Sequence, residues 1–334
     1  MEMKKILNNP GDYVDEMLGG IIAAHGQIWS RFGDDGRVIA RAKGSIPGKV
    51  GIVTGGGSGH LPVFLGYVGD GLLDACAVGN VFAGPRVSDC QVAMRSADGG
   101  AGVLQLYGNY GGDKMNFDMA REFLELEGME VAAVRVADDV ASAPLEERHK
   151  RRGVAGMVFA FKVAGAKAAE GGTLAEVAEV AGKAANACRS IGVAMTPCTV
   201  PESGRPTFTI DEQDIEFGMG IHGEPGIWRG KLKTADELTE EMMSRLLAEL
   251  GLESGGRVAI LVNSLGATPP EELYIMYRYA AAMLARREIT PVLPLVGRYA
   301  TSMDMAGASI TLMPLDGELE RLLGAPASSP FWHC

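Results

Sequence analysis

Two histidines stand in glycine-rich surroundings, where an imidazole could do chemistry on a small molecule. His222 lies within residues 218–226, with a glutamate two positions on and a proline that closes the turn. His60 ends the stretch 55–60, and a proline follows two positions later. Glycine permits positive φ and close backbone approach, so each imidazole is expected on a tight, nearly bare loop. Such settings are hard to explain as core packing, and we expect both histidines to converge on one site.

A third glycine-rich stretch carries a carboxylate. Asp113 follows the apolar run 103–107, and a helix is predicted from about residue 116 to residue 127. An aspartate just before a helix is often its N-cap. Alongside two loop histidines, the better interpretation is a catalytic base, because a carboxylate can accept the proton of a substrate hydroxyl.

The chemistry that these groups favour is nucleophilic rather than metal-based. A neutral imidazole can attack the carbonyl of a small ketone, which would give a hemiaminal. The chain has no H-x-x-x-H or C-x-x-C spacing, no Walker motif and no G-x-S-x-G, so no metal is expected on it. Buried or incidental reduced thiols are expected at Cys76, Cys90, Cys188, Cys198 and Cys334.

The composition is that of a globular protein with a small-molecule ligand. In 334 residues, 47% are hydrophobic and 22% charged, and the net charge is 31 − 42 = −11 without a Lys/Arg-rich run. This argues against a nucleic-acid or anionic-membrane partner. No segment has the length and apolar character of a bilayer span or a signal peptide, so the expected location is the cytoplasm.

Predicted strands and helices alternate along the first part of the chain, as in a mostly parallel sheet. A buried strand at 50–54 feeds the His60 loop, and alanine-rich helices are predicted at 154–171 and 173–191. The charged run 146–153, with His149, is expected to be solvated surface. Further strands include 207–210, and residues 326–334 are predicted to be coil.

The expected fold is therefore two α/β domains, each with a central mostly parallel or mixed sheet flanked by helices. Residues 1–192 would carry the His60 and Asp113 loops, and residues 193–334 would carry the His222 loop. The active site is expected between these glycine-rich loops, because ligands of α/β sheets bind where strands end.

The order and content of these motifs resemble the dihydroxyacetone-binding subunit of the dihydroxyacetone kinases over essentially the whole chain. The resemblance is carried by residues 55–60 with Pro62, 79–82, 109–110 with 112–113 and 116–117, 218–226, 262–268 and 302–307.

The resemblance implies a role for each candidate residue. His222 matches the histidine that holds the substrate as a hemiaminal, and His60 matches one that hydrogen-bonds the ketose and assists proton transfer. Asp113 matches the base for the hydroxyl that is phosphorylated. Substrate-binding positions are expected at Gly57, Ser58, Gly59 and Gly108.

The resemblance also implies that this chain binds no cofactor and cannot phosphorylate alone. A separate helical subunit would carry ATP or ADP with Mg²⁺. In one branch of the family a phosphotransferase-system protein recharges bound ADP, and in another ATP exchanges directly. The assembly would include a homodimer of this chain.

Two positions depart from the family pattern. Leu61 stands where a glutamate usually follows the histidine, and Gly108 stands where a lysine usually precedes Asn109. The pocket could be shaped for a larger ketose, such as erythrulose or a branched pentulose. The alternative is neutral loss of an exposed salt bridge between these two positions, which would contribute only about 0–1 kcal/mol to stability. A non-catalytic ketose sensor and a metal-dependent lyase or hydrolase are the competing function classes.

Overall fold

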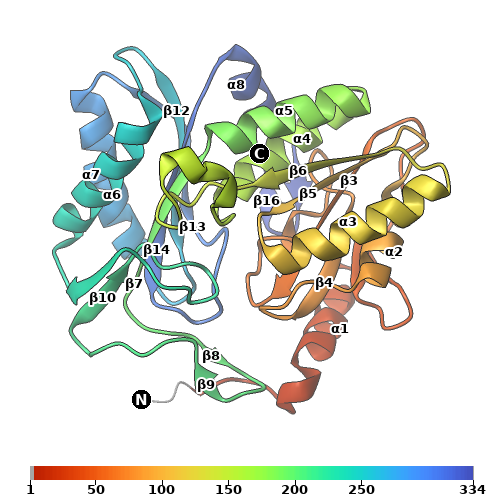
Figure 1. Ribbon diagram of the computed structural model, residues 1–334, viewed down its shortest axis with the longest axis horizontal. Helices are drawn as coiled ribbons and strands as arrows, with labels where there is room; N and C mark the ends of the chain where they lie inside the picture. The colour runs from red at the N-terminus through yellow and green to blue at the C-terminus, as the bar shows by residue number, and fades with distance from the viewer. Residues whose placement is uncertain (1–3, 334) are drawn as a thin grey trace.

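The computed structural model describes residues 4–333 and contains two six-stranded sheets with helices between and around them (Figure 1). The α-helices are α1 (Tyr13–His25), α2 (Val87–Ala97), α3 (Gly111–Leu126), α4 (Gly156–Ala169), α5 (Leu174–Ala187), α6 (Ala235–Leu250), α7 (Pro270–Arg286) and α8 (Gly317–Leu323). Short 3₁₀ helices are η1 (Pro10–Asp12), η2 (Leu65–Tyr67) and η3 (Leu145–Lys150).

The first sheet combines parallel and antiparallel strands. Its order is β1 (Trp29–Phe32), β2 (Val38–Arg41), β4 (Ala75–Val81), β3 (Gly51–Ser58), β5 (Val103–Gly108) and β6 (Val131–Val136). The strands from β4 to β6 are parallel neighbours, while β1 and β2 join as an antiparallel edge. The carboxyl ends of β3 and β5 therefore meet at one edge, which brings their glycine-rich continuations together.

The second sheet is mostly antiparallel. Its order is β11 (Trp228–Lys231), β10 (Asp214–Phe217), β7 (Arg189–Ala194), β14 (Gly307–Pro314), β12 (Arg257–Ser264) and β13 (Thr290–Gly297). Only its β12–β13 pair is parallel. Two-stranded pairs are formed by β8 (Thr199–Val200) with β9 (Arg205–Pro206), and by β15 (Ser328–Ser329) with β16 (Trp332–His333). These sheets flanked by helices confirm the predicted fold class.

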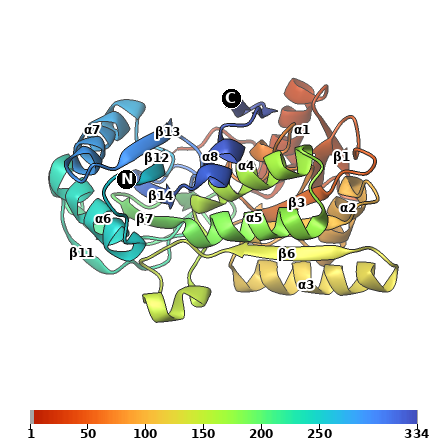
Figure 2. The ribbon, with the colours of Figure 1, turned by 90° about the horizontal axis from the view of Figure 1, so that it is seen from above.

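Helices and sheets alternate in five layers (Figures 1 and 2). Helices α6 and α7 cover the outer face of the second sheet, and α2 and α3 cover the outer face of the first. Helices α4 and α5 lie between the sheets and contact both, so the central hydrophobic core is shared by the two. The division into residues 1–192 and 193–334 stays a proposal.

Local sequence sets several helix boundaries. Thr173 and Thr234 each begin a helix with a capping box, in which the threonine hydroxyl and a glutamate at the third helical position satisfy free N–H groups. Helix α4 is buried almost all round, as its small and apolar residues require of a helix between two sheets.

Four predicted boundaries are wrong. Helix α5 ends at Ala187, and the residues after it form β7 within the second sheet. No strand covers residues 207–210, and part of the predicted coil at 326–334 pairs as β15 and β16. Helix α3 begins at Gly111 instead of residue 116. The first three errors concern strands, which depend on pairing between distant segments that local pattern does not report, whereas the start of α3 lies in a glycine pair of low helix propensity.

The glycines at 55–57 are strand residues rather than a loop, because β3 continues to Ser58. Close packing explains them. A Cβ on Gly56 would collide with the Phe64 ring, and one on Gly57 would lie 2.8 Å from the Phe82 Cα. The loop proper is therefore shorter than predicted.

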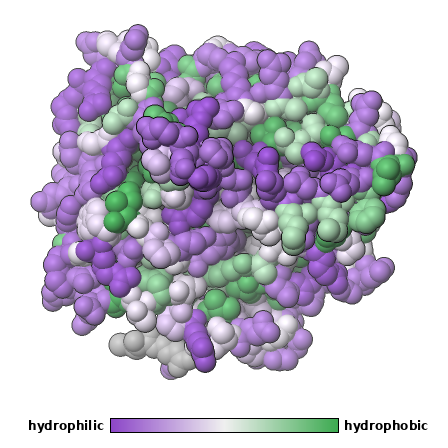
Figure 3. Space-filling model, in the orientation of Figure 1, coloured by the Kyte–Doolittle hydropathy of each residue, from purple (hydrophilic) through white to green (hydrophobic). Residues whose placement is uncertain are grey.

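The surface is mostly hydrophilic in the view of Figure 3, with hydrophobic side chains in the region of α3. The large apolar residues exposed on that helix are Met115, Met119, Phe123 and Leu126.

Within residues 4–333, none of the helices combines the length and apolar character that a bilayer crossing requires. His149 is exposed, as predicted, and Cys76, Cys90, Cys188 and Cys198 are buried free thiols. Cys334 lies outside the described residues.

Candidate active site

The His222 loop leaves the end of β10 and returns to β11. Gly218 and Gly223 have φ of +84° and +85°, a left-handed conformation that disfavours other residues. The Gly218 N–H donates to the Gly192 carbonyl at 2.7 Å, which fixes the loop to β7. The His222 side chain keeps 22% of its surface exposed. Its ring is therefore accessible to a ligand, as the sequence predicts.

The glutamate two positions after His222 determines which ring nitrogen carries the proton. Glu224 Oε1 lies 2.9 Å from His222 Nδ1, and Oε2 accepts the His222 backbone N–H at 3.0 Å. Burial alone would raise the pKa of Glu224, but the hydrogen bond and charge of His222 lower it to about 2. An ionised carboxylate only accepts, so Nδ1 holds a proton, and in the neutral form of the ring Nε2 holds the free lone pair. This leaves Nε2 as the nucleophilic atom.

Gly220 provides the space that Glu224 occupies. A Cβ at this position would collide with Glu224 Oε2 and lie 2.6 Å from Arg152 Nη1. We expect Gly220→Ala to displace the carboxylate and to weaken binding of the ketose that the resemblance implies by about tenfold, the worth of one charge-assisted hydrogen bond. Calorimetric titration checks this, with Gly182→Ala of α5 as the control, because nothing lies within 4 Å of a Cβ there. Equal affinity of the Gly220 variant and the wild type would contradict it.

The second histidine lies directly against the first. The rings of His60 and His222 are 4.7 Å apart between centroids, at an interplanar angle of 83°. His60 Nδ1 lies 2.6 Å from the Thr301 carbonyl, which can only accept, so Nδ1 carries the proton. The buried Nε2 has no hydrogen-bond partner among the described residues. Burial, and then the charge of His222, lower the pKa of His60 to about 3. The ring is therefore neutral at physiological pH, and Nε2 can accept a hydrogen bond from a ligand.

The candidate base lies in the first turn of α3 and is not its N-cap, which is Tyr110. The Asp113 side chain is largely buried, and its Oδ1 has no hydrogen-bond partner in the described part of the chain. A Cβ on Gly84 would lie 2.7 Å from that oxygen, so the glycine makes room for the carboxylate. Burial raises the pKa of Asp113 to about 6, while the charge of His222 opposes this shift. A carboxylate with this pKa is well matched to proton abstraction near neutral pH.

Aromatic side chains complete the wall around His222. The rings of Tyr110 and Phe82 lie 4.7 and 5.5 Å from the His222 ring, both in edge-to-face geometry. The Tyr110 hydroxyl donates to the Gly153 carbonyl at 2.9 Å, which fixes the ring. These side chains limit the directions from which a ligand can approach Nε2.

The predicted substrate-binding positions lie on both sides of the histidine pair. Gly57 and Ser58 end β3, and the Ser58 hydroxyl donates to the Gly79 carbonyl at 2.8 Å. Gly59 turns the chain with φ of +102°. Gly108 ends β5, and a Cβ there would lie 3.2 Å from the Tyr110 ring. The ligand contacts of these residues stay a prediction.

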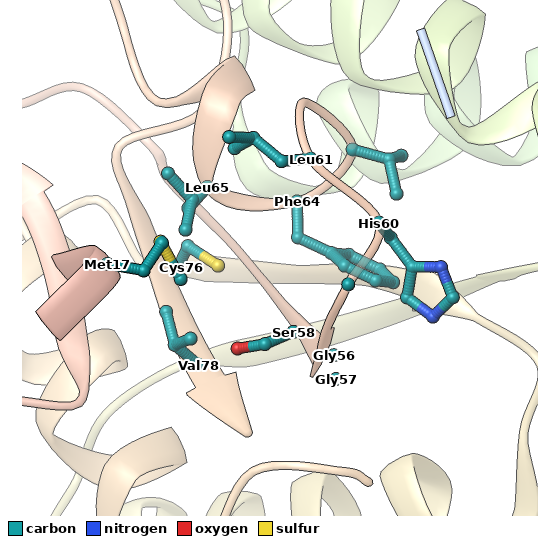
Figure 4. Close-up of a pocket in the computed structure, with 12 residues that line it drawn as sticks. Met17, Gly56, Gly57, Ser58, His60, Leu61, Phe64, Leu65, Cys76 and Val78 are labelled. Atoms are coloured by element: carbon teal, nitrogen blue, oxygen red, sulfur yellow. The ribbon is translucent and has the colours of Figure 1, made fainter. Parts of the chain in front are cut away.

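The two departures from the family pattern have different surroundings. Leu61 lines a small cavity of about 20 Å³, together with His60, Ser58 and the apolar side chains of Leu65, Cys76 and Val78 (Figure 4). A side chain at Gly108 would instead press on Tyr110, which walls His222. Both positions therefore border the histidine site, Leu61 through the cavity that it shares with His60 and Gly108 through Tyr110.

Sequence reasoning missed several partners of the histidines. The sequence places Glu224 beside His222 and Tyr110 within a motif of the resemblance but assigns a role to neither, and nothing in it points to Thr301, which a distant segment brings to His60. The charged run 146–153 is only partly solvated surface. Arg152 turns inward, with 14% of its side chain exposed, towards the His222 loop.

Comparison with known proteins supports one family. The family model described as the Dak1 domain matches residues 19–331. A dihydroxyacetone-binding subunit of a phosphotransferase-system-dependent dihydroxyacetone kinase from Listeria innocua is 43% identical over 99% of both chains. An L-erythrulose kinase from Pectobacterium atrosepticum is 45% identical over 98% of this chain, which spans 56% of that relative.

Two solved structures have the same fold. The dihydroxyacetone kinase of C. freundii, in complex with AMP-PNP and Mg²⁺, matches 99% of this chain with a TM-score of 0.89 and 31% identity, and the match spans 61% of that chain. A dihydroxyacetone kinase operon co-activator matches 95% of this chain and 97% of its own length, with a TM-score of 0.87 and 31% identity.

Proposed function

Because the chain belongs to the Dak1 family, we propose that it is the substrate-binding subunit of a dihydroxyacetone-type kinase. The observation that carries this proposal is the histidine pair. The His222 ring is accessible, its Nδ1 faces the Glu224 carboxylate so that Nε2 is the nitrogen left for a ligand, and a second imidazole lies 4.7 Å away between ring centroids. This arrangement suits a short ketose, whose carbonyl can be bonded and whose hydroxyls need acceptors.

The proposed covalent step adds His222 N–H across the ketone. The Nε2 lone pair forms a bond to the keto carbon, and the carbonyl π pair moves to oxygen, which takes a proton from solvent. The Nδ1 proton is released toward the Glu224 carboxylate, 2.9 Å away. The product is a hemiaminal, so a polyol such as glycerol, which has no carbonyl, is excluded.

His60 and Asp113 act on the hydroxyl groups of the bound ketose. The free lone pair of His60 Nε2 accepts a hydrogen bond from one hydroxyl, which satisfies an otherwise orphaned buried atom. Asp113 takes the proton from the hydroxyl that receives the phosphoryl group. The covalent bond holds that hydroxyl in position, which lowers the entropic part of the barrier to in-line transfer.

We propose that the phosphoryl donor lies on a separate helical subunit with ATP or ADP and Mg²⁺. What supports this is the likeness, over 99% of both chains, to a relative that is itself named a dihydroxyacetone-binding subunit of a phosphotransferase-system-dependent kinase. The exposed apolar residues Met115, Met119 and Phe123 follow Asp113 along α3, where a partner that reaches Asp113 can cover them. A phosphotransferase-system protein as source of phosphate, and a homodimer of this chain, belong to the same proposal.

A ketose panel tests the substrate. The chain is mixed with an ATP-loaded nucleotide-binding subunit of the family and supplied with dihydroxyacetone, both erythrulose enantiomers and a branched pentulose. We expect phosphorylation of dihydroxyacetone and no phosphorylation of glycerol. Preference for erythrulose would support the larger-ketose alternative, for which the Gly108 surroundings and the erythrulose kinase relatives are the favouring observations. Phosphorylation of none of them would contradict the kinase proposal.

A ketose sensor is the second candidate function. It is favoured by the likeness to the operon co-activator, which has the same fold at 31% identity. A sensor would bind the ketose but give no turnover with the ATP-loaded subunit, so the same panel separates the two. Retention of His60, Asp113 and His222 together favours the kinase, because a sensor needs no base for phosphoryl transfer.

A further inference from the structure

Arg152 contacts both ends of the His222 loop. Its Nη2 donates to the Gly218 carbonyl at 3.2 Å, and its Nη1 lies 3.9 Å from Glu224 Oε2. Gly218 begins the loop, and Glu224 holds the His222 ring. One guanidinium therefore spans the segment whose geometry determines where Nε2 points.

The arginine is itself firmly anchored. Its Nε donates to Asp139 Oδ2 at 2.9 Å, and Nη2 lies 2.8 Å from the same oxygen. Asp139 is 2% exposed, and its Oδ1 accepts the Ala141 N–H at 3.0 Å. The Arg152 backbone N–H donates to the Ser142 hydroxyl at 3.0 Å. The planar guanidinium is thus fixed from both its backbone and its head group.

A loop rich in glycine needs such an anchor. Gly218 and Gly223 have positive φ, and Gly220 lacks the Cβ that would otherwise restrict the backbone. A loop of this composition has many accessible conformations when free. A fixed positive charge beside Glu224 and a hydrogen bond to Gly218 select one of them.

We propose that Arg152, held by Asp139, is a positioning residue for the reaction at His222. It fixes the Glu224 carboxylate against Nδ1, so that the ring presents the lone pair of Nε2 to the ketose. Arg152 touches no reacting atom. The role in ketose capture rests on the function proposed above, but the effect on the ring itself does not require a ketose.

The neighbouring arginine supplies a matched control. Arg151 points to the opposite side, where it makes two 2.7 Å contacts with the Glu249 carboxylate and donates to the Ala143 carbonyl at 2.8 Å. Arg151 is more buried than Arg152, because 1% of its side chain is exposed against 14% for Arg152. Replacing Arg151 therefore tests the cost of losing a buried arginine–glutamate ion pair that makes no contact with the His222 loop.

The test compares Arg152→Met, Arg152→Lys and Arg151→Met in the full chain with ¹⁵N-labelled histidine. Long-range ¹⁵N–¹H spectra report which nitrogen of His222 carries the proton in the ligand-free protein. We expect the Nδ1–H form in the wild type and in Arg151→Met, and a mixture of both forms in Arg152→Met. Affinity for dihydroxyacetone should fall by about tenfold or more in Arg152→Met and stay at the wild-type value in Arg151→Met.

Two further arms keep the outcome decisive. Arg152→Lys keeps a charge but not the planar fork, so an intermediate tautomer mixture is expected even where Arg152→Met does not fold. Arg152→Ala should recover the Nδ1–H form when methylguanidinium is added. An unchanged tautomer in folded Arg152→Lys and Arg152→Ala would overturn the inference. If the wild type shows no affinity for any ketose, the proposed function fails, and the tautomer spectra still decide on Arg152.

Discussion

Replacing His222 by alanine is expected to abolish the ketose adduct and to reduce turnover with the nucleotide-bearing subunit by at least about 10³-fold. The reason is that the covalent bond supplies both affinity and orientation, and the lone pair of the neighbouring His60 Nε2 is fully buried, where it can accept a hydrogen bond. Dihydroxyacetone labelled with ¹³C at its carbonyl makes the measurement direct, because a hemiaminal carbon resonates as an sp³ centre instead of a ketone. A crystal of the ketose complex would show the bond itself.

The control for this variant is His149→Ala. His149 is exposed on η3, and the alanine keeps the backbone carbonyl that accepts from the Asn109 side chain. Wild-type binding and turnover are expected there. The covalent role of His222 is wrong if His222→Ala binds and turns over dihydroxyacetone as well as the wild type does.

Asp113→Asn should separate binding from phosphoryl transfer. The amide cannot accept the hydroxyl proton, so turnover is expected to fall by about 10²- to 10⁴-fold. The adduct at His222 should still form, since Asp113 makes no bond to the His222 or Glu224 side chains. Asp118→Asn, farther along α3 and half-buried, is the matched control.

The pH dependence gives the same assignment a second signature. Burial raises the pKa of Asp113 to about 6, so the base is ionised above that pH and protonated below it. Turnover at saturating ketose should therefore fall as the pH drops through about 6, and Asp113→Asn should lack this limb. The raised pKa means that ionisation of the buried carboxyl opposes folding, so the asparagine variant is expected to be at least as stable as the wild type at pH 7. Full turnover of Asp113→Asn would exclude the residue as the base.

The sequence located the groups that can react. Glycines lie on both sides of His222, at 220 and 223, and directly precede His60, and this pattern, which permits tight turns and close backbone approach, can be seen without coordinates. Alternation of apolar runs with helical patterns likewise predicts sheets flanked by helices. Both features depend on neighbouring residues in the chain, so they can be predicted from the sequence without knowledge of tertiary contacts.

Tertiary structure alone decided which nitrogen of His60 carries the proton and where the Arg152 side chain lies. The proton of His60 sits on Nδ1 because Thr301, 241 positions away in sequence, offers its carbonyl. The charged run at 146–153 predicts solvated surface, yet the Arg152 side chain turns inward because it donates hydrogen bonds to the buried Asp139 carboxylate and to the Gly218 carbonyl. These hydrogen-bond partners lie on separate elements that meet only when the sheets and helices pack. Residue spacing along the chain therefore does not predict them.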